Sequence, residues 1–156
     1  MLKKAFTLIE LLIVIAIIGI LAAFMFTNLQ GSRERARDAR RKGDLNAIQS
    51  SLRLYYNDHQ SFPLSTSPSY NITGASWGSS FLDSANGTTY MGSVPEDPNT
   101  NTGAKYKYYS NGNTYVLAAV LENKSDPDAE ESQDRCPSYS SASFTKTETD
   151  YVVCEE

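Results

Sequence analysis

The sequence of 156 residues predicts an α+β fold, in which one long N-terminal helix packs on a small antiparallel sheet. Two observations predict it. Residues 6–57 contain no proline, and their second half keeps apolar side chains at helical spacing. Residues 105–153, by contrast, hold short runs rich in β-formers, the first two of which flank a turn signal. A chain of this length makes one domain.

The long helix begins with an apolar segment, residues 6–26, in which Thr7 and Glu10 are the polar exceptions. Roughly 20 such residues cross a bilayer as a helix, so we predict a transmembrane helix over residues 6–26. A carboxylate in such a helix costs about 2.5–3.5 kcal/mol at the centre of the bilayer. Glu10 is therefore expected to lie near the membrane interface or to have a partner.

The helix is expected to continue through residues 27–57 as an amphipathic segment. Leu45, Ile48 and Leu52 recur at helical spacing and predict the stripe that packs against the rest of the domain. Gly31 and Gly43 interrupt this segment, and each costs up to about 1 kcal/mol inside a helix. They either allow a bend or are simply tolerated.

Residues 58–156 are predicted to form a globular head. Residues 64–104 are rich in Ser, Thr, Asn, Gly and Pro and predict a long loop region with short elements around residues 77–82 and 88–91. A hairpin follows over residues 105–122, with Asn111-Gly112-Asn113 as its turn. A third strand is predicted over residues 145–153.

The expected core lies between this sheet and the second half of the helix. Leu45, Ile48 and Leu52 would be buried there. Tyr106 or Tyr108 and the apolar side of residues 116–120 would complete the core.

Charge is unevenly distributed along the chain. Residues 33–53 hold seven bases and three acids, whereas residues 54–156 hold five bases and fourteen acids. The basic segment 33–42 could contact nucleic acid. It is more typical of a solvated helix face with its own ion pairs, of attraction to anionic lipid headgroups, or of pairing with the acidic heads of neighbouring subunits. We expect no nucleic-acid partner.

Few side chains suggest chemistry. His59 is the single histidine and, at the end of a helix, predicts a cap or surface residue. No nucleophile with a base, phosphate-binding glycine loop or dense metal cluster stands out, so the protein is predicted not to be an enzyme.

The N-terminal run has a motif of its own. It reads Lys3-Lys4-Ala5-Phe6-Thr7-Leu8-Ile9-Glu10-Leu11-Leu12 and continues as an apolar segment to Ala23. This run resembles the N-terminus of the type IV pilin superfamily, which includes pilins and the pseudopilins of type II secretion and competence. The resemblance implies the pilin fold.

The resemblance also implies how the N-terminus is processed. Residues 1–5 would be a leader, cleaved between Ala5 and Phe6 by a prepilin peptidase that also methylates the new amine of Phe6. Glu10 would pair with the N-terminal amine of a neighbouring subunit. Ala5 stands where the family usually has glycine. An ordinary signal anchor, or a secretory signal cleaved after Ala22-Ala23, is the alternative interpretation of this segment.

The two cysteines, Cys136 and Cys154, bracket a loop near the end of the sequence. An even count in an exported chain favours a disulfide, and the resemblance agrees. Two free thiols in a reducing compartment are the alternative.

An acidic stretch precedes Cys136. Some secretion pseudopilins bind calcium in the corresponding loop, which makes Asp126, Asp128 and Glu130 candidate ligands. A solvated acidic loop is the alternative.

The function that follows is a structural subunit that polymerises through its N-terminal helix into a type IV pilus-like filament. A pseudopilin of a type II secretion system is the alternative, and a membrane-tethered monomeric adhesin a remote one. The expected partners are copies of the chain, minor pilins or pseudopilins, the prepilin peptidase, the assembly platform and the bilayer. The expected location is the cytoplasmic membrane before assembly, with the head outside the cytoplasm, and a cell-surface filament afterwards.

Overall fold

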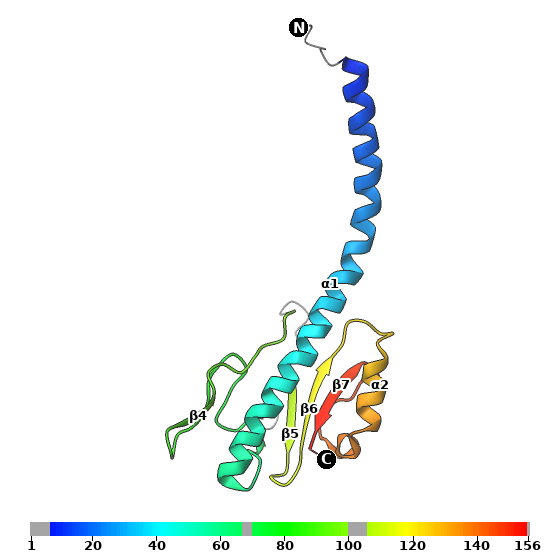
Figure 1. The fold of residues 1–156 in the computed structure, drawn as a ribbon. Helices are drawn as coiled ribbons and strands as arrows, with labels where there is room; N and C mark the ends of the chain where they lie inside the picture. The colour runs from blue at the N-terminus through cyan, green and yellow to red at the C-terminus, as the bar shows by residue number, and fades with distance from the viewer. Residues whose placement is uncertain (1–6, 67–69, 100–105, 156) are drawn as a thin grey trace. The chain divides into compact units, whose positions relative to one another are not determined.

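The structure is a computed structural model that describes residues 7–66, 70–99 and 106–155, without the side chains of residues 24–29. The chain divides into two units, residues 1–34 and residues 35–156. One helix, α1, contributes to both units, and the second unit also contains the sheet (Figure 1).

Helix α1 covers Leu8–His59 and confirms the predicted long helix, although it ends two residues later than predicted. It passes through Gly31 and Gly43 without interruption. It ends because Gln60 adopts the left-handed conformation, with φ of 53°, and its N–H donates to the carbonyl of Tyr56. Phe6, where the helix was predicted to begin, lies outside the described residues.

The main sheet has three antiparallel strands in the order β5 (Lys107–Ser110), β6 (Tyr115–Val120) and β7 (Asp150–Cys154). Strands β5 and β6 form the predicted hairpin, closed by the pair Ser110 and Tyr115. Its turn contains Gly112 at φ of +93°, a conformation that glycine adopts without strain. Strand β7 begins later than predicted because the carboxylate of Asp150 accepts the N–H of Thr147 and folds the preceding residues into a turn.

Two small hairpins precede the sheet, within the predicted loop region. They pair β1 (Ser65–Thr66) with β2 (Asn71–Ile72) and β3 (Phe81–Asp83) with β4 (Thr88–Met91). Strand β4 has the predicted bounds of the second short element. Figure 1 places β4 on one side of α1, and β7 with α2 on the other.

The acidic stretch after β6 is a helix, so the expectation of a loop there was wrong. Helix α2 covers Pro127–Asp134, and the 3-10 helix η2 follows over Pro137–Ser141. The carboxylate of Asp126 accepts the N–H of Asp128 as the N-cap of α2, and Pro127 occupies the first turn. An acidic N-cap followed by proline is a favourable helix start.

The sheet is buried on both faces. Tyr115, Leu117 and Ala119 of β6 face the α1 stripe of Leu45, Ile48 and Leu52, as predicted, together with both Tyr106 and Tyr108. Val116 and Ala118 face the opposite way and pack in a second core with side chains of η2 and the residues after it. The prediction of a single core was therefore incomplete. The second core follows from the unpredicted helices, which cover the outer face of the sheet.

Gly43 offers a test of the continuous helix. It is exposed, and an added Cβ would meet no atom within 4 Å. Gly43→Ala is expected to raise the free energy of unfolding of residues 35–156 by about 0.5–1 kcal/mol, because alanine favours the helix. Denaturant unfolding of the solubilised full chain, followed by Trp77 fluorescence, measures it. Gly112→Ala, at a positive φ, is the matched control and should be destabilising. A loss of stability for Gly43→Ala would contradict an unbroken helix.

Candidate functional site

The first residues of α1 expose apolar side chains on every face. Within this unit Leu8, Leu12 and Ile20 are 88%, 62% and 61% exposed. A helix that is apolar all round is normally covered by lipid or by other protein. This surface is therefore the first candidate for a functional site.

Glu10 has a local partner at the start of this helix. Its backbone N–H donates to Oγ1 of Thr7 at 3.3 Å, while its Oε2 lies 3.2 Å from that hydroxyl and 3.4 Å from the N–H of Thr7. This reciprocal arrangement is a capping box, with Thr7 as N-cap and Glu10 three residues later. The sequence analysis predicted that Glu10 lies near the membrane interface or has a partner, but it did not identify Thr7 as a partner. The Thr-x-x-Glu spacing of Thr7 and Glu10 is the sequence signal of this capping box.

Membrane crossing was predicted for residues 6–26. Among the residues that the structure describes, no helix combines the length and the apolar character needed to cross a membrane. Phe6 and the side chains of residues 24–26 lie outside the description. The proposed cleavage between Ala5 and Phe6 also falls on residues that are not described.

The basic segment meets the acidic head at a buried arginine. Arg41 is 1% exposed, and its guanidinium makes a two-pronged contact with Asp97, at 2.8 Å for each nitrogen. It also contacts Asp38 at 2.7 Å and Glu122 at 2.8 Å. Burial by itself would lower the pKa of Arg41, but the hydrogen bonds with Asp97, Glu122 and Asp38 outweigh it and hold the pKa above its ordinary value.

Asp38 and Glu122 extend this contact. The carboxylate of Asp38 accepts the backbone N–H groups of Glu122 at 3.0 Å and Asn123 at 2.9 Å. Glu122 also accepts from Nε of Arg37 at 2.7 Å. Chiefly because of Arg37, and then Arg41, the pKa of Glu122 falls to about 2 from 4.5. We call Arg37, Asp38, Arg41, Asp97 and Glu122 the ion network.

Lys42 binds two of the acids that the sequence analysis named as candidate calcium ligands. Its ammonium lies 2.7 Å from both Asp126 and Asp128, the two acids at the start of α2. Burial would lower the pKa of Lys42, but these two bonds raise it overall. In residues 7–66, 70–99 and 106–155, no group of three His, Cys, Asp or Glu side chains could hold a metal ion. Two of the three candidate calcium ligands, Asp126 and Asp128, thus meet at the ammonium of Lys42, and Glu130 is not part of this contact.

The other predicted residues have local roles. Cys136 and Cys154 form the predicted disulfide, with Cα atoms 5.8 Å apart. His59 stacks on Tyr55, and its Nε2 lies 3.1 Å from Oδ2 of Asp83, so it joins the end of α1 to β3. Arg37, Arg41 and Lys42 all contact carboxylates of their own chain, which favours the interpretation of the basic segment as an ion-paired helix face.

Comparison with known proteins bears on the N-terminal segment and on most of the chain. Residues 1–26 match the family described as the prokaryotic N-terminal methylation motif. The chain is 30% identical over 134 residues to the type II secretion system core protein G of Pseudomonas aeruginosa, which covers 82% of this chain and 92% of that protein.

Two further relatives carry the same name. The Escherichia coli protein is 29% identical over 96 residues, which is 62% of this chain and 66% of the relative. The Dickeya chrysanthemi protein is 36% identical over 61 residues, which is 39% of this chain and 40% of the relative. These two alignments thus span less than two thirds of each relative. No solved structure matches the chain significantly.

A methylation motif that opens a long helix, itself packed on a small antiparallel sheet, defines a member of the type IV pilin superfamily. Within it, the chain belongs to the family of the type II secretion system core protein G, because it aligns with nearly the whole Pseudomonas protein. Its members are non-enzymatic structural proteins. These relatives favour the pseudopilin interpretation over the pilus subunit that was placed first.

The lowered pKa of Glu122 makes the stability contributed by the ion network depend on pH. A carboxyl whose pKa is about 2 when folded and 4.5 when unfolded stabilises the fold above pH 4.5, and this contribution disappears as the pH falls towards 2. Glu122→Gln should therefore lower the free energy of unfolding by about 1.5–3 kcal/mol at pH 7. The difference from the wild type should shrink as the pH falls from 4.5 towards 2.

Denaturant unfolding of the solubilised chain between pH 7 and pH 3 measures this difference. Glu148→Gln is the matched control, because Glu148 is exposed and its carboxylate has no partner among the described residues. A gap between Glu122→Gln and wild type that stays constant down to pH 3 would contradict the assignment to the Glu122 carboxylate.

Proposed function

We propose that this chain is a pseudopilin, a structural subunit that polymerises through its N-terminal helix within a type II secretion system. The alignment with 92% of the Pseudomonas core protein G carries this proposal. The methylation motif over residues 1–26 supports an inner-membrane precursor that is processed before assembly.

Each step of the proposal uses particular residues. Residues 6–26 anchor the precursor in the membrane, and the peptidase cleaves between Ala5 and Phe6 and methylates Phe6. In the polymer, the exposed apolar surface of residues 8–23 packs against other copies instead of lipid. Glu10 then pairs with the amine of a neighbour, which neutralises its charge inside an apolar bundle.

The partners follow from the same steps. They are copies of the chain, minor pseudopilins, the prepilin peptidase, the assembly platform and the bilayer. A subunit of a type IV pilus remains the second candidate, because the disulfide between Cys136 and Cys154 closes a loop near the end of the sequence, as in many pilins. The relatives weigh against it.

Mass spectrometry on the native host separates the two candidates. Washed membranes and sheared surface material are compared for the mature chain. We expect a chain that begins at methylated Phe6 and stays with the membrane fraction. A sheared fraction dominated by this chain would indicate a pilus instead. A retained leader in both fractions would mean that Ala5 blocks processing, and the polymer proposal would fail at its first step.

Glu10 has two roles to separate, capping its helix and pairing in the polymer. Glutamine at this position keeps the capping box but removes the charge, whereas alanine removes both. We expect Glu10→Gln and Glu10→Ala to reduce polymer yield alike. Thr7→Ala, which weakens the cap by about 1 kcal/mol but keeps the charge, should assemble.

The yield is measured as cross-linkable polymer in cells with equal amounts of processed subunit. Normal assembly of Glu10→Gln together with failure of Thr7→Ala would show that capping is the role of Glu10 and would refute the pairing step.

A further inference from the structure

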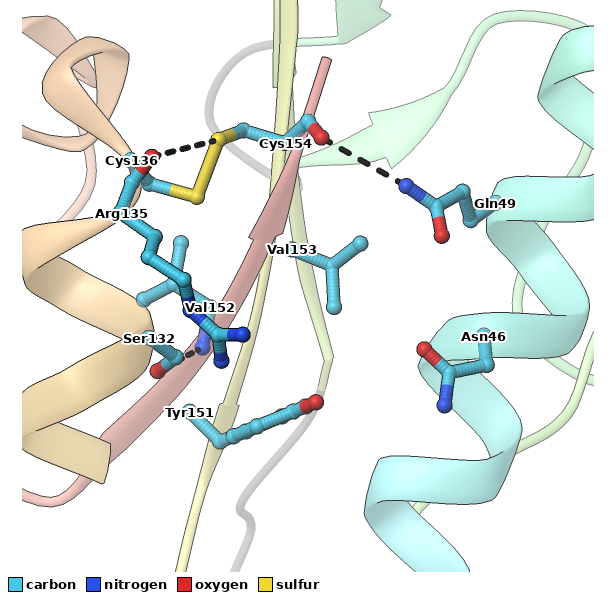
Figure 2. A pocket seen from close by; sticks show the side chains of 9 residues that line it. All are labelled: Asn46, Gln49, Ser132, Arg135, Cys136, Tyr151, Val152, Val153 and Cys154. Carbon is cyan, nitrogen blue, oxygen red and sulfur yellow. Dashed lines mark hydrogen bonds between the residues drawn. A yellow bond between two sulfur atoms is a disulfide. The ribbon is translucent and has the colours of Figure 1, made fainter. Parts of the chain in front are cut away.

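A polar groove lies between α1, β7 and the end of α2, in the unit of residues 35–156 (Figure 2). Its volume is about 180 Å³. Asn46 and Gln49 line it from α1, Arg135 from the end of α2, and Tyr151 from β7. Cofactor and drug-sized sites occupy about 300–1,000 Å³, so this groove suits the end of a side chain.

Among the described residues, Arg135 is the one charged side chain in the lining of the groove. Nε of Arg135 donates to the carbonyl of Glu131 at 3.3 Å, and its two terminal nitrogens have no acceptor among the described residues. The amide of Asn46 and the hydroxyl of Tyr151 likewise have no partner in the described part of the chain. No carboxylate belongs to the lining. An arginine fork with free terminal nitrogens binds a carboxylate in two-pronged geometry, so the chemistry points to an acid.

The groove is held in place by its surroundings. The disulfide joins Cys136, next to Arg135, to Cys154 of β7. Ser132 of α2 accepts the N–H of Val152 at 2.9 Å through Oγ, and Gln133 donates to the carbonyl of Asp150 at 2.8 Å. These bonds fix α2 on the edge of β7. They also use the N–H of Val152 and the carbonyl of Asp150, two backbone groups that a further strand would need in order to pair with the edge of β7. The groove therefore suits a side chain better than a strand from another molecule.

We propose that this groove receives the carboxylate of Glu96 from a second copy of the chain. The proposal rests on the polymer described under the proposed function. A polymer of identical subunits uses head-to-tail contacts, in which two different surfaces of the same chain meet. The occupant must therefore come from a part of the chain away from the groove.

Charge and position favour Glu96. Five exposed head carboxylates have no side-chain partner among the described residues, namely Glu96, Glu130, Glu131, Asp134 and Glu148. The last four lie on α2 or just before β7, on the same side of α1 as the groove. Glu96 lies in the segment between β4 and β5, where the carbonyl of Val94 accepts the N–H of Gly78 at 2.8 Å and the N–H of Val94 donates to the carbonyl of Ser79 at 2.7 Å. The segment thus pairs with the residues that lead into the hairpin of β3 and β4, and Figure 1 shows β4 on the other side of α1 from β7 and α2.

Glu96 is also presented by a defined backbone. Its carboxylate lies against Gly78, where an added Cβ would sit 2.9 Å from Cδ and Oε1 of Glu96. The next residue, Asp97, is bound to the buried Arg41. The segment that carries Glu96 is thus fixed to α1 through Asp97, which does not belong to the lining of the groove.

Charge reversal in the full-length chain tests the contact. We expect Arg135→Glu and Glu96→Arg each to reduce the yield of cross-linkable polymer by about tenfold or more, because each places like charges together. The double variant should recover to within about threefold of wild type, since it restores the opposite pair. Lys124→Glu and Glu148→Arg are matched controls with the same charge changes on exposed residues outside the groove and should assemble normally.

Subunit level, processing and the disulfide are checked in every variant, so that only folded, processed chains are compared. Normal assembly of Arg135→Glu alongside a polymerising wild type would overturn this contact and leave the proposed function standing. Loss in both single variants without recovery in the double, or loss in Arg135→Glu alone, would overturn Glu96 as the occupant. A processed wild-type chain that forms no polymer would overturn the proposed function and this contact with it.

Discussion

The buried guanidinium of Arg41 is the contact on which the second unit depends. It joins Asp38 of the same helix to Asp97 before the sheet and to Glu122 after β6. The apolar stripe of Leu45 and its neighbours supplies burial, but apolar contact is not directional and would tolerate a head shifted along the helix. A buried arginine tolerates no such shift, because a shifted head would take both Asp97 and Glu122 away from the guanidinium, and breaking a buried ion pair costs about 3–5 kcal/mol. The ion network therefore sets the register of sheet on helix.

This arrangement divides the charges of the chain between two tasks. Arg37, Arg41 and Lys42 are committed to carboxylates of their own subunit, so the basic segment is much less available to a partner than its composition indicates. Contacts between subunits must then use charges that the fold leaves unpaired, and Arg135 and Glu96 are of this kind. The apolar helix surface drives assembly without direction, and a few such polar contacts decide which subunit faces meet.

The long helix, the hairpin and the apolar stripe were predictable because each rests on local pattern: period 3.6, alternation around Asn111-Gly112, and the absence of proline. The helix α2 was missed although Asp126-Pro127 signals a helix start, because its acidic composition was interpreted as a calcium loop or solvated loop. The ion network has no local signal. Arg41 meets a residue 56 positions away in Asp97, and such a pairing is fixed by tertiary packing alone. The groove at Arg135 could not be predicted from the sequence for the same reason, because residues of α1, of β7 and at the end of α2 line it together.

Glu10 shows that a structural role and an assembly role can share one carboxylate. In the capping box Oε2 accepts both the N–H and the hydroxyl of Thr7, and Oε1 has no partner among the described residues. An ionised carboxylate can accept about four hydrogen bonds, so capping leaves an oxygen available for an incoming amine. The cap also holds the side chain at the start of the helix, which reduces the entropy lost when the pair forms. Local capping therefore does not compete with the proposed pairing, because it leaves one carboxylate oxygen of Glu10 available to the amine of a neighbouring subunit.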